Sequence, residues 1–197
     1  MTYKRSCLSF ALSLFGLGLN ARDISHEEEI AMARESAPPR ITDDASVMAW
    51  QDGRYVEISE GSNEFTCLVL RDAFGRFEPS CFNQAALDAV LPVYEYQTRA
   101  LEKGRSITEI HTEISRRAEN GELPQVQPGA LVYMMSPRNR YYNFWTKELV
   151  DVPPHIMLYY PKLEQTDLCF DGEDGLPNFF MEYPHLSVVH ITTETGR

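Results

Sequence analysis

One short run of residues constrains the fold more strongly than any other part of the chain. Residues 155–160 are mostly large and apolar, and prolines stand at positions 153, 154 and 161. Alternate side chains of a strand point to opposite faces, so His155, Met157 and Tyr159 would share one face. Because both faces carry large side chains and proline cannot donate to a ladder, the run predicts a central strand with well-marked ends.

The first 21 residues are typical of a secretory signal peptide. Lys4 and Arg5 form a basic start, and an apolar stretch, residues 7–19, follows. That stretch is too short to span a bilayer, although a retained membrane anchor is the alternative. We therefore expect a signal peptide over residues 1–21 and a single α+β domain over residues 22–197, exported to a periplasm or secreted.

The charge of the chain restricts its partners. The formal net charge is -11, and loss of Lys4 and Arg5 with the signal peptide would leave 16 basic and 29 acidic side chains, or -13. Such a field repels nucleic acid and anionic membrane surfaces. We therefore expect that the protein has no nucleic-acid partner, and that it is not an integral membrane protein.

Three cysteines remain after the signal peptide, and export would permit a disulfide between two of them. Cys67 and Cys81 are 14 residues apart, and closing a loop of that size is worth roughly 3 kcal/mol. The prediction is a Cys67–Cys81 disulfide with Cys169 unpaired. Pairings that involve Cys169 would close much longer loops and remain open alternatives.

The first part of the mature chain indicates β structure. Asp52-Gly53 separates two strand-like runs and is typical of a hairpin turn. A third apolar run, residues 65–70, follows a second turn. The pattern predicts a three-stranded meander over residues 45–70.

Helix signals occur at three places. Ser25 is a candidate N-cap for a short N-terminal helix, and Asn83 for a longer one that Pro92 would kink or divide. Ser106 and Glu109 form a capping box for another helix. Further strands are expected at residues 130–135, 155–160, 179–183 and 186–192. The predicted fold class is α+β, with a mostly antiparallel sheet, formed by the N-terminal meander and the C-terminal strands, packed against two central helices.

Several short motifs are shared with one group of proteins. They are Asn63-Glu64-Phe65-Thr66-Cys67-Leu68, Cys81-Phe82-Asn83 at the opening of a helix, Tyr133-Met134-Met135-Ser136 and Pro154-His155-Ile156-Met157. With the signal peptide, they resemble a family of uncharacterised exported bacterial proteins. The resemblance implies export and the Cys67–Cys81 pairing, and it implies no activity.

The segment 136–154 is the strongest candidate for a binding site. It is long for an unstructured connection, and it places cations and aromatics side by side in an acidic protein. Arginine and aromatic residues are enriched in recognition surfaces, and we expect a mobile surface loop in which Arg138, Arg140, Tyr142 and Trp145 bind a ligand. The expected partner is a small anionic molecule, a glycan or a protein. Cation–π pairing within the loop is the alternative.

His155 is the candidate catalytic residue, because Pro153 and Pro154 deliver the loop directly onto its strand. A histidine at a pocket mouth can act as acid or base near neutrality. A core histidine satisfied by a backbone carbonyl is the competing interpretation.

Metal and cofactor chemistry find little support in the spacing of residues. Histidines and methionines on the predicted strands suit copper, but no two histidines have close ligand spacing, and methionine commonly fills cores. We therefore predict no metal and no cofactor. Three classes of function stay open, which are a binding module, a periplasmic enzyme that uses His155 and a structural envelope protein.

Overall fold

The computed structural model describes residues 24–164, 167, 178–183 and 185–192. The predicted signal peptide, Cys169 and the acidic segment 171–175 lie outside the described residues.

The structure confirms the α+β class. The helices are α1 (His26–Ala33), the 3₁₀ helix η1 (Arg34–Ser36), α2 (Pro39–Thr42), α3 (Gln84–Glu102) and α4 (Ile107–Glu119). The strands are β1 (Ser46–Gln51), β2 (Arg54–Ser59), β3 (Phe65–Arg71), β4 (Phe77–Asn83), β5 (Leu131–Met134), β6 (Arg140–Asn143), β7 (Glu148–Asp151), β8 (His155–Tyr160), β9 (Asn178–Tyr183) and β10 (Leu186–Thr192). They form one sheet in the order β2-β1-β3-β4-β5-β8-β10-β9, and a β6–β7 hairpin joins it through β4.

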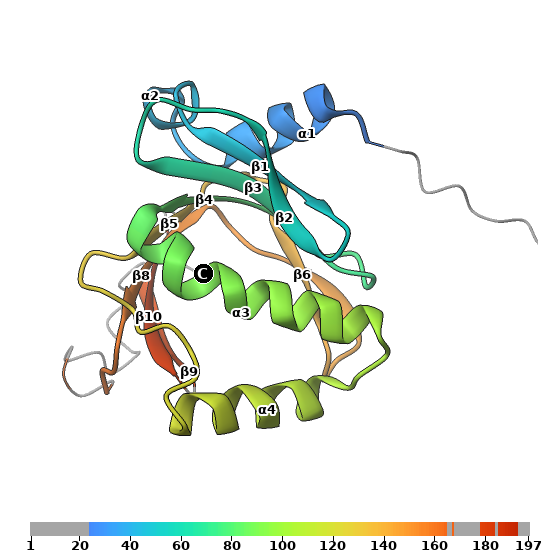
Figure 1. Ribbon diagram of the computed structural model, residues 1–197, viewed down its shortest axis with the longest axis vertical. Helices are drawn as coiled ribbons and strands as arrows, with labels where there is room; N and C mark the ends of the chain where they lie inside the picture. Colours follow the sequence, from blue (N-terminus) through green and yellow to red (C-terminus); the bar gives the residue numbers. More distant parts are fainter. Residues whose placement is uncertain (1–23, 165–166, 168–177, 184, 193–197) are drawn as a thin grey trace, which may run out of the picture.

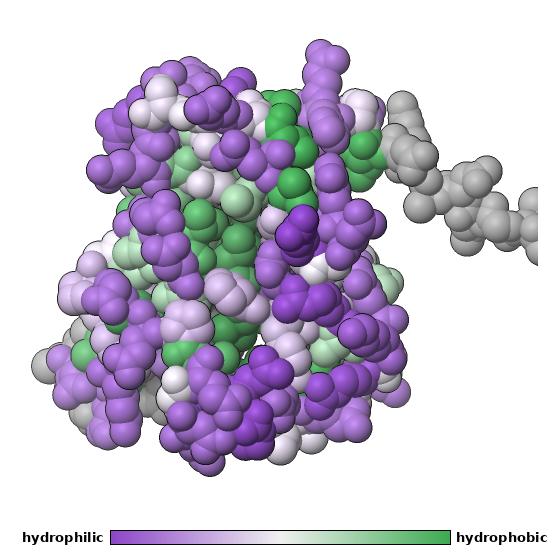
Figure 2. Space-filling view, in the orientation of Figure 1, coloured by the Kyte–Doolittle hydropathy of each residue, from purple (hydrophilic) through white to green (hydrophobic). Residues whose placement is uncertain are grey.

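The sheet separates two hydrophobic cores. Figure 1 shows α1 and α2 on one side of β1 and β3, and α3 on the other side, which we call the inner face. Leu68, Phe82 and Val132 on the inner face are buried with residues of α3. On the outer face, Val47 and Val69 are buried against α1. Apolar residues gather near the middle of the view in Figure 2, with hydrophilic residues around them.

The predicted meander is wrong in its strand order. β1 and β2 form the expected antiparallel hairpin around Asp52 and Gly53, both of which have positive φ. β3, however, lies on the far side of β1 and runs parallel to it, with Val47 opposite Cys67. The connection over residues 60–64 therefore crosses from one side of β1 to the other, which local sequence patterns do not encode.

Strand β4 was not predicted, because Pro79 stands at its centre and proline is usually confined to edges and bulges of sheets. Along one side, β4 pairs with all of β3. Along the other side it pairs with β5 only at Cys81 and Phe82, and with β6 only at Phe77. Pro79 thus lies between the part of β4 that pairs with β6 and the part that pairs with β5. No continuous ladder runs past it on that side, so its missing amide donor breaks no strand pairing there.

The predicted Cys67–Cys81 disulfide is confirmed, but its setting differs from the expectation. Cys81 lies inside β4 and not at the opening of a helix, directly opposite Cys67 of β3. Both cysteines are fully buried in the outer core. The bridge therefore links two central strands of the sheet.

The helix caps are confirmed, and the effect expected of Pro92 is not. Ser25 and Ser106 each form a capping box, with Glu28 and Glu109. Helix α3 runs undivided past Pro92 from the N-cap Asn83. Helix α4 buries its apolar stripe against α3, so the two helices form successive layers over the inner face (Figure 1).

Replacing Asn83 by Ala is expected to lower the free energy of unfolding by about 1–2 kcal/mol, the upper range for an N-cap. The Asn83 side chain accepts hydrogen bonds from the N–H groups of Ala86 (3.1 Å) and Leu131 (3.0 Å), and it donates to the Gly129 carbonyl (2.8 Å). The substitution leaves all three groups without this partner. Urea unfolding measures the change. Asn120→Ala at the exposed end of α4 is the matched control, and an equal loss there would contradict the assignment.

Candidate functional site

The segment 136–154 is a hairpin rather than an unstructured mobile loop, which corrects the sequence prediction. Strands β6 and β7 pair over their whole length. At the base of the hairpin, the buried Asn139 side chain donates to the Met134 carbonyl (2.6 Å), and the backbone carbonyl of Asn139 accepts from the Val152 N–H (2.8 Å). These bonds fix the hairpin to the end of β5.

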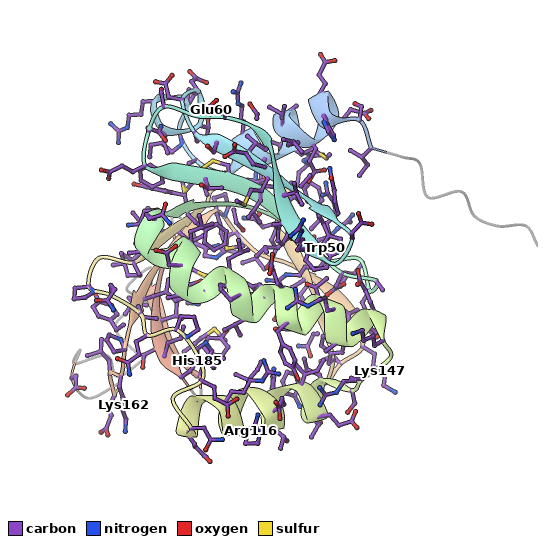
Figure 3. All side chains as sticks on the ribbon, viewed as in Figure 1. Trp50, Glu60, Arg116, Lys147, Lys162 and His185 are labelled. Atoms are coloured by element: carbon purple, nitrogen blue, oxygen red, sulfur yellow. A yellow bond between two sulfur atoms is a disulfide. The ribbon has the colours of Figure 1, made fainter. Side chains whose placement is uncertain are left out.

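Trp145 stands at the tip of this hairpin and is 77% exposed. The Asn143 side chain accepts hydrogen bonds from the N–H groups of Trp145 (2.9 Å) and Thr146 (3.2 Å), which closes the turn. Lys147 completes the turn with a φ of 62° and marks the position of the tip in Figure 3. The exposure of Trp145 is what a binding surface requires, and its turn is internally braced.

Phe144, the residue before Trp145, belongs to an aromatic cluster. The rings of Phe74, Tyr142 and Phe144 lie with each pair of centroids 5.1 Å apart. Leu149 lies opposite Tyr142 across the hairpin and is exposed. We call Phe74, Tyr142, Phe144, Trp145 and Leu149 the aromatic surface. It combines side chains from two separate turns of the chain.

The aromatic surface is held on a rigid support. Asp72 accepts hydrogen bonds from the N–H groups of Phe74 (2.8 Å) and Arg76 (3.2 Å), which fixes the turn between β3 and β4. Phe144 packs against the core between α3 and α4, and the Trp145 ring lies 6.5 Å from the ring of His111 on α4. Rigid aromatic anchors lose little conformational entropy when a partner binds.

Arg138 and Arg140, which the sequence predicted to bind an anionic ligand, lie apart from the tip. They line a small cavity of about 270 Å³ together with Phe77 and Asp151. The Arg138 guanidinium pairs with both carboxylate oxygens of Glu35 and lies over the Phe77 ring at 4.8 Å. An anionic ligand would have to compete with Glu35. The alternative, cation–π pairing within the loop, does not describe Arg138 either, because Phe77 and Glu35 both lie outside segment 136–154.

His155 does not line the mouth of either cavity described here. The side chain is only 1% exposed, and its Nδ1 lies 2.8 Å from the Pro153 carbonyl. This contact is the one that the competing interpretation, a core histidine, requires, but it satisfies only one of the two ring nitrogens. Burial lowers the pKa of His155 below its ordinary value, so the ring is neutral at neutral pH.

A second histidine, which sequence spacing missed, lies beside His155. β8 pairs with β10 so that Met157 is opposite His190 and His155 is opposite Thr192. The His155 and His190 rings stack with centroids 5.3 Å apart. Burial, and then the neighbouring His155, lower the pKa of His190 to about 3. The only sequence signal for the pair was the period-two placement of histidines on two apolar strands.

Further charges are buried on the same inner face. Arg76 forms an ion pair with Glu78 of β4, and its guanidinium lies over the Tyr94 ring at 4.8 Å. Both side chains of the ion pair are largely buried. Burial also raises the pKa of Tyr159 well above its ordinary value. No cavity described here reaches this cluster, so we assign it to stability.

A second cavity is an open hollow of about 720 Å³ beyond the end of α4. His185 and Lys162, both labelled in Figure 3, contribute to its wall with Leu123 and Leu163. None of the residues that the sequence predicted to bind ligand lies there.

Comparison with known proteins adds no identification. No family model, no curated protein and no solved structure matches the chain. Across the described part of the chain, no helix is both long and apolar enough to cross a membrane. In the same residues, no three side chains of the types His, Cys, Asp and Glu come together to hold a metal ion.

Proposed function

We propose that this chain is an exported binding module that engages a protein partner through the aromatic surface. The observation that carries the proposal is the exposure of Trp145 at the tip of a braced hairpin, together with the exposure of Phe74 and Leu149 on the aromatic surface. Tryptophan and tyrosine dominate the energetics of protein interfaces, especially when apolar neighbours exclude water around them. An exposed apolar patch on an acidic protein is also costly unless a partner covers it.

The composition of the surface favours a protein over a glycan or a small anion. Phe74, Phe144 and Leu149 offer no hydrogen-bonding side-chain groups for sugar hydroxyls. The Asn143 side chain in the turn is engaged by the backbone. Arg138 is engaged by Glu35, so its guanidinium is not available to a small anion. Apolar side chains of a protein complement such a surface best.

Export is part of the proposal and rests on two observations. The first residues have the composition of a signal peptide. The Cys67–Cys81 disulfide is of a kind that persists in oxidising compartments and is rare in the cytosol. The partner is therefore expected in the periplasm or outside the cell.

Photo-crosslinking in the exporting cell tests the proposal. A benzophenone amino acid at position 145 is expected to give one discrete protein adduct, identified by mass spectrometry. The same amino acid at position 191 is the control, because Ile191 is an exposed apolar residue on β10. Absence of an adduct at position 145, or the same adducts from both positions, would contradict the proposal. An adduct with a sugar polymer would replace the protein partner by a glycan.

Trp145→Ala is expected to weaken binding of the purified, crosslinked partner by about 30-fold or more, the effect of losing an interface hot spot. Because the indole is exposed, the free energy of unfolding should stay within about 0.5 kcal/mol of the parent. Calorimetric titration and urea unfolding give the two numbers. Ile191→Ala is the control for loss of an exposed apolar side chain. A weakening no larger than that of the control would remove Trp145 from the site.

A further inference from the structure

Four side chains with soft or borderline ligand atoms meet on the inner face of three neighbouring strands. Met134 of β5 lies directly opposite His155 of β8, and Met157 of β8 lies directly opposite His190 of β10. His155 and Met157 alternate along β8, so they share one face. We call these four residues the His/Met quartet. Sequence spacing argued against grouping them as metal ligands, and only the strand pairing brings them together.

His155 has the hydrogen bonding of a metal-ligating histidine. Its Nδ1 donates to the Pro153 carbonyl at 2.8 Å, which leaves the lone pair on Nε2. That Nε2 atom is buried and has no hydrogen-bond partner among the residues that the structure describes. Histidine ligands commonly donate their second nitrogen to a backbone carbonyl, because this bond fixes the tautomer and the ring orientation. A core histidine gains nothing from a buried, unpaired Nε2.

The spacing of the two imidazoles suits a shared ion. A tetrahedral ion with bonds of about 2.0 Å to two imidazole nitrogens places the ring centroids roughly 5.2 Å apart. The observed distance between the His155 and His190 centroids is 5.3 Å. The distance between the rings therefore suits a shared ion. Because the rings stack at an interplanar angle of 25°, at least one ring must turn about its side-chain torsions before both in-plane lone pairs point at the ion.

We propose that the His/Met quartet binds one Cu(I) ion. Thioether sulfur together with imidazole nitrogen selects Cu(I) over Zn²⁺ and over the hard cations, which prefer oxygen. All four ligands are neutral, and a buried neutral site accommodates a monovalent ion at a lower electrostatic cost than a divalent one. Glu78 is the charged group that acts on His155, and it is already paired with Arg76.

The two methionines differ in how freely their sulfur atoms can bind an ion. Met134 is 1% exposed and lies within the inner core. The Met157 sulfur accepts a hydrogen bond from the Tyr159 hydroxyl at 3.0 Å. This weak bond must lengthen or be shared when Met157 turns toward an ion. Met134 is thus the sulfur ligand whose removal should have the clearer effect.

The test uses the full chain with Cys7→Ser and Cys169→Ser, since thiols outside the disulfide would themselves bind Cu(I). Because the quartet is buried, the protein is unfolded in urea and refolded anaerobically with Cu(I) and ascorbate. Ascorbate is chosen over thiol reductants, which compete for Cu(I) and attack the disulfide. Titration with bathocuproine disulfonate, a chromogenic Cu(I) chelator, then gives stoichiometry and affinity. One Cu(I) per chain is expected, with both sulfur and nitrogen neighbours in X-ray absorption.

Matched pairs of substitutions separate the quartet from nearby residues. Met134→Leu and His155→Gln are each expected to weaken Cu(I) binding at least tenfold, the minimum typical even for outer-shell changes. Met135→Leu and His185→Gln, which alter the same residue types outside the quartet, should match the parent. Met134→Leu conserves volume and is expected to fold even where His155→Gln does not.

Several results would overturn the proposal. Failure of the refolded parent to retain Cu(I) would do so, as would X-ray absorption without sulfur neighbours. Equal affinities for Met134→Leu and Met135→Leu would show that the quartet is only a core. None of these outcomes bears on partner binding by Trp145, so the two proposals stand or fall separately.

Discussion

Replacing Glu78 by Ala is expected to destabilise the protein by about 3–5 kcal/mol, the cost of leaving a buried charge without its partner. Arg76 and Glu78 are both largely buried on the inner face, and the Arg76 guanidinium is covered by the Tyr94 ring. Glu78 raises the pKa of Arg76, although burial alone would lower it. Removing Glu78 leaves only the effect of burial, but a guanidinium stays protonated in proteins. The arginine therefore keeps its charge in a buried site without its partner. Urea unfolding and the melting temperature measure the loss.

A surface ion pair provides the matched control. Glu113 on α4 accepts hydrogen bonds from Arg116 (2.9 Å) and Arg117 (2.8 Å) on a solvated helix face. Exposed pairs contribute little, because water and salt screen them. Glu113→Ala should therefore leave the melting temperature unchanged within error. If Glu78→Ala also left the melting temperature unchanged, the inner-face ion pair would contribute no more to stability than a surface pair.

Local features of the fold were predictable from the sequence because neighbouring residues create them. The caps at Ser25, Asn83 and Ser106 depend on a side chain and a backbone N–H two or three residues away. The apolar run before Pro161 indicated β8 for the same reason. In each case the residues that decide the structure are adjacent in the chain.

Features that depend on strand order were not predictable. Nothing in the apolar pattern of β3 distinguishes pairing with β2 from parallel pairing with β1, since both bury the same faces. Pro79 concealed β4, because its tolerance depends on where β5 ends and β6 begins along that strand. The short strands of the β6–β7 hairpin were hidden by polar residues and by an Asn143 turn.

The candidate site also combines features that the sequence indicated with features that depend on strand pairing. The composition of segment 136–154 drew attention to Trp145, although not to Phe74, which packs against Phe144 from another turn. His155 was singled out for its position after two prolines, but its neighbour His190 is 35 positions further along the chain. Only the register of β8 against β10 places the two rings together. A contact between residues on two separate strands cannot be predicted from the spacing of residues in a single sequence.

Loss of the Cys67–Cys81 disulfide is expected to lower stability by about 3 kcal/mol, since the bridge closes a loop with a sequence separation of 14. For a domain of this size the loss corresponds to roughly 6–12 °C in melting temperature. The preferred comparison is one protein in urea with and without reductant, because reduction removes the bridge without changing core volume. Both cysteines are fully buried, and as thiols they remain acceptable apolar side chains in the outer core.

Cys169→Ser provides the control for this comparison, and it also tests the predicted pairing. In the oxidised state the unfolding midpoint of this variant should match that of the parent. Peptide mapping of the parent without reductant should recover Cys67 and Cys81 in one linked pair. A midpoint that reductant does not move would show that the two central strands need no covalent link. A bridge to Cys169 would contradict the cross-strand pairing of Cys67 with Cys81, and with it the register between β3 and β4 on which the inner-face position of Glu78 depends.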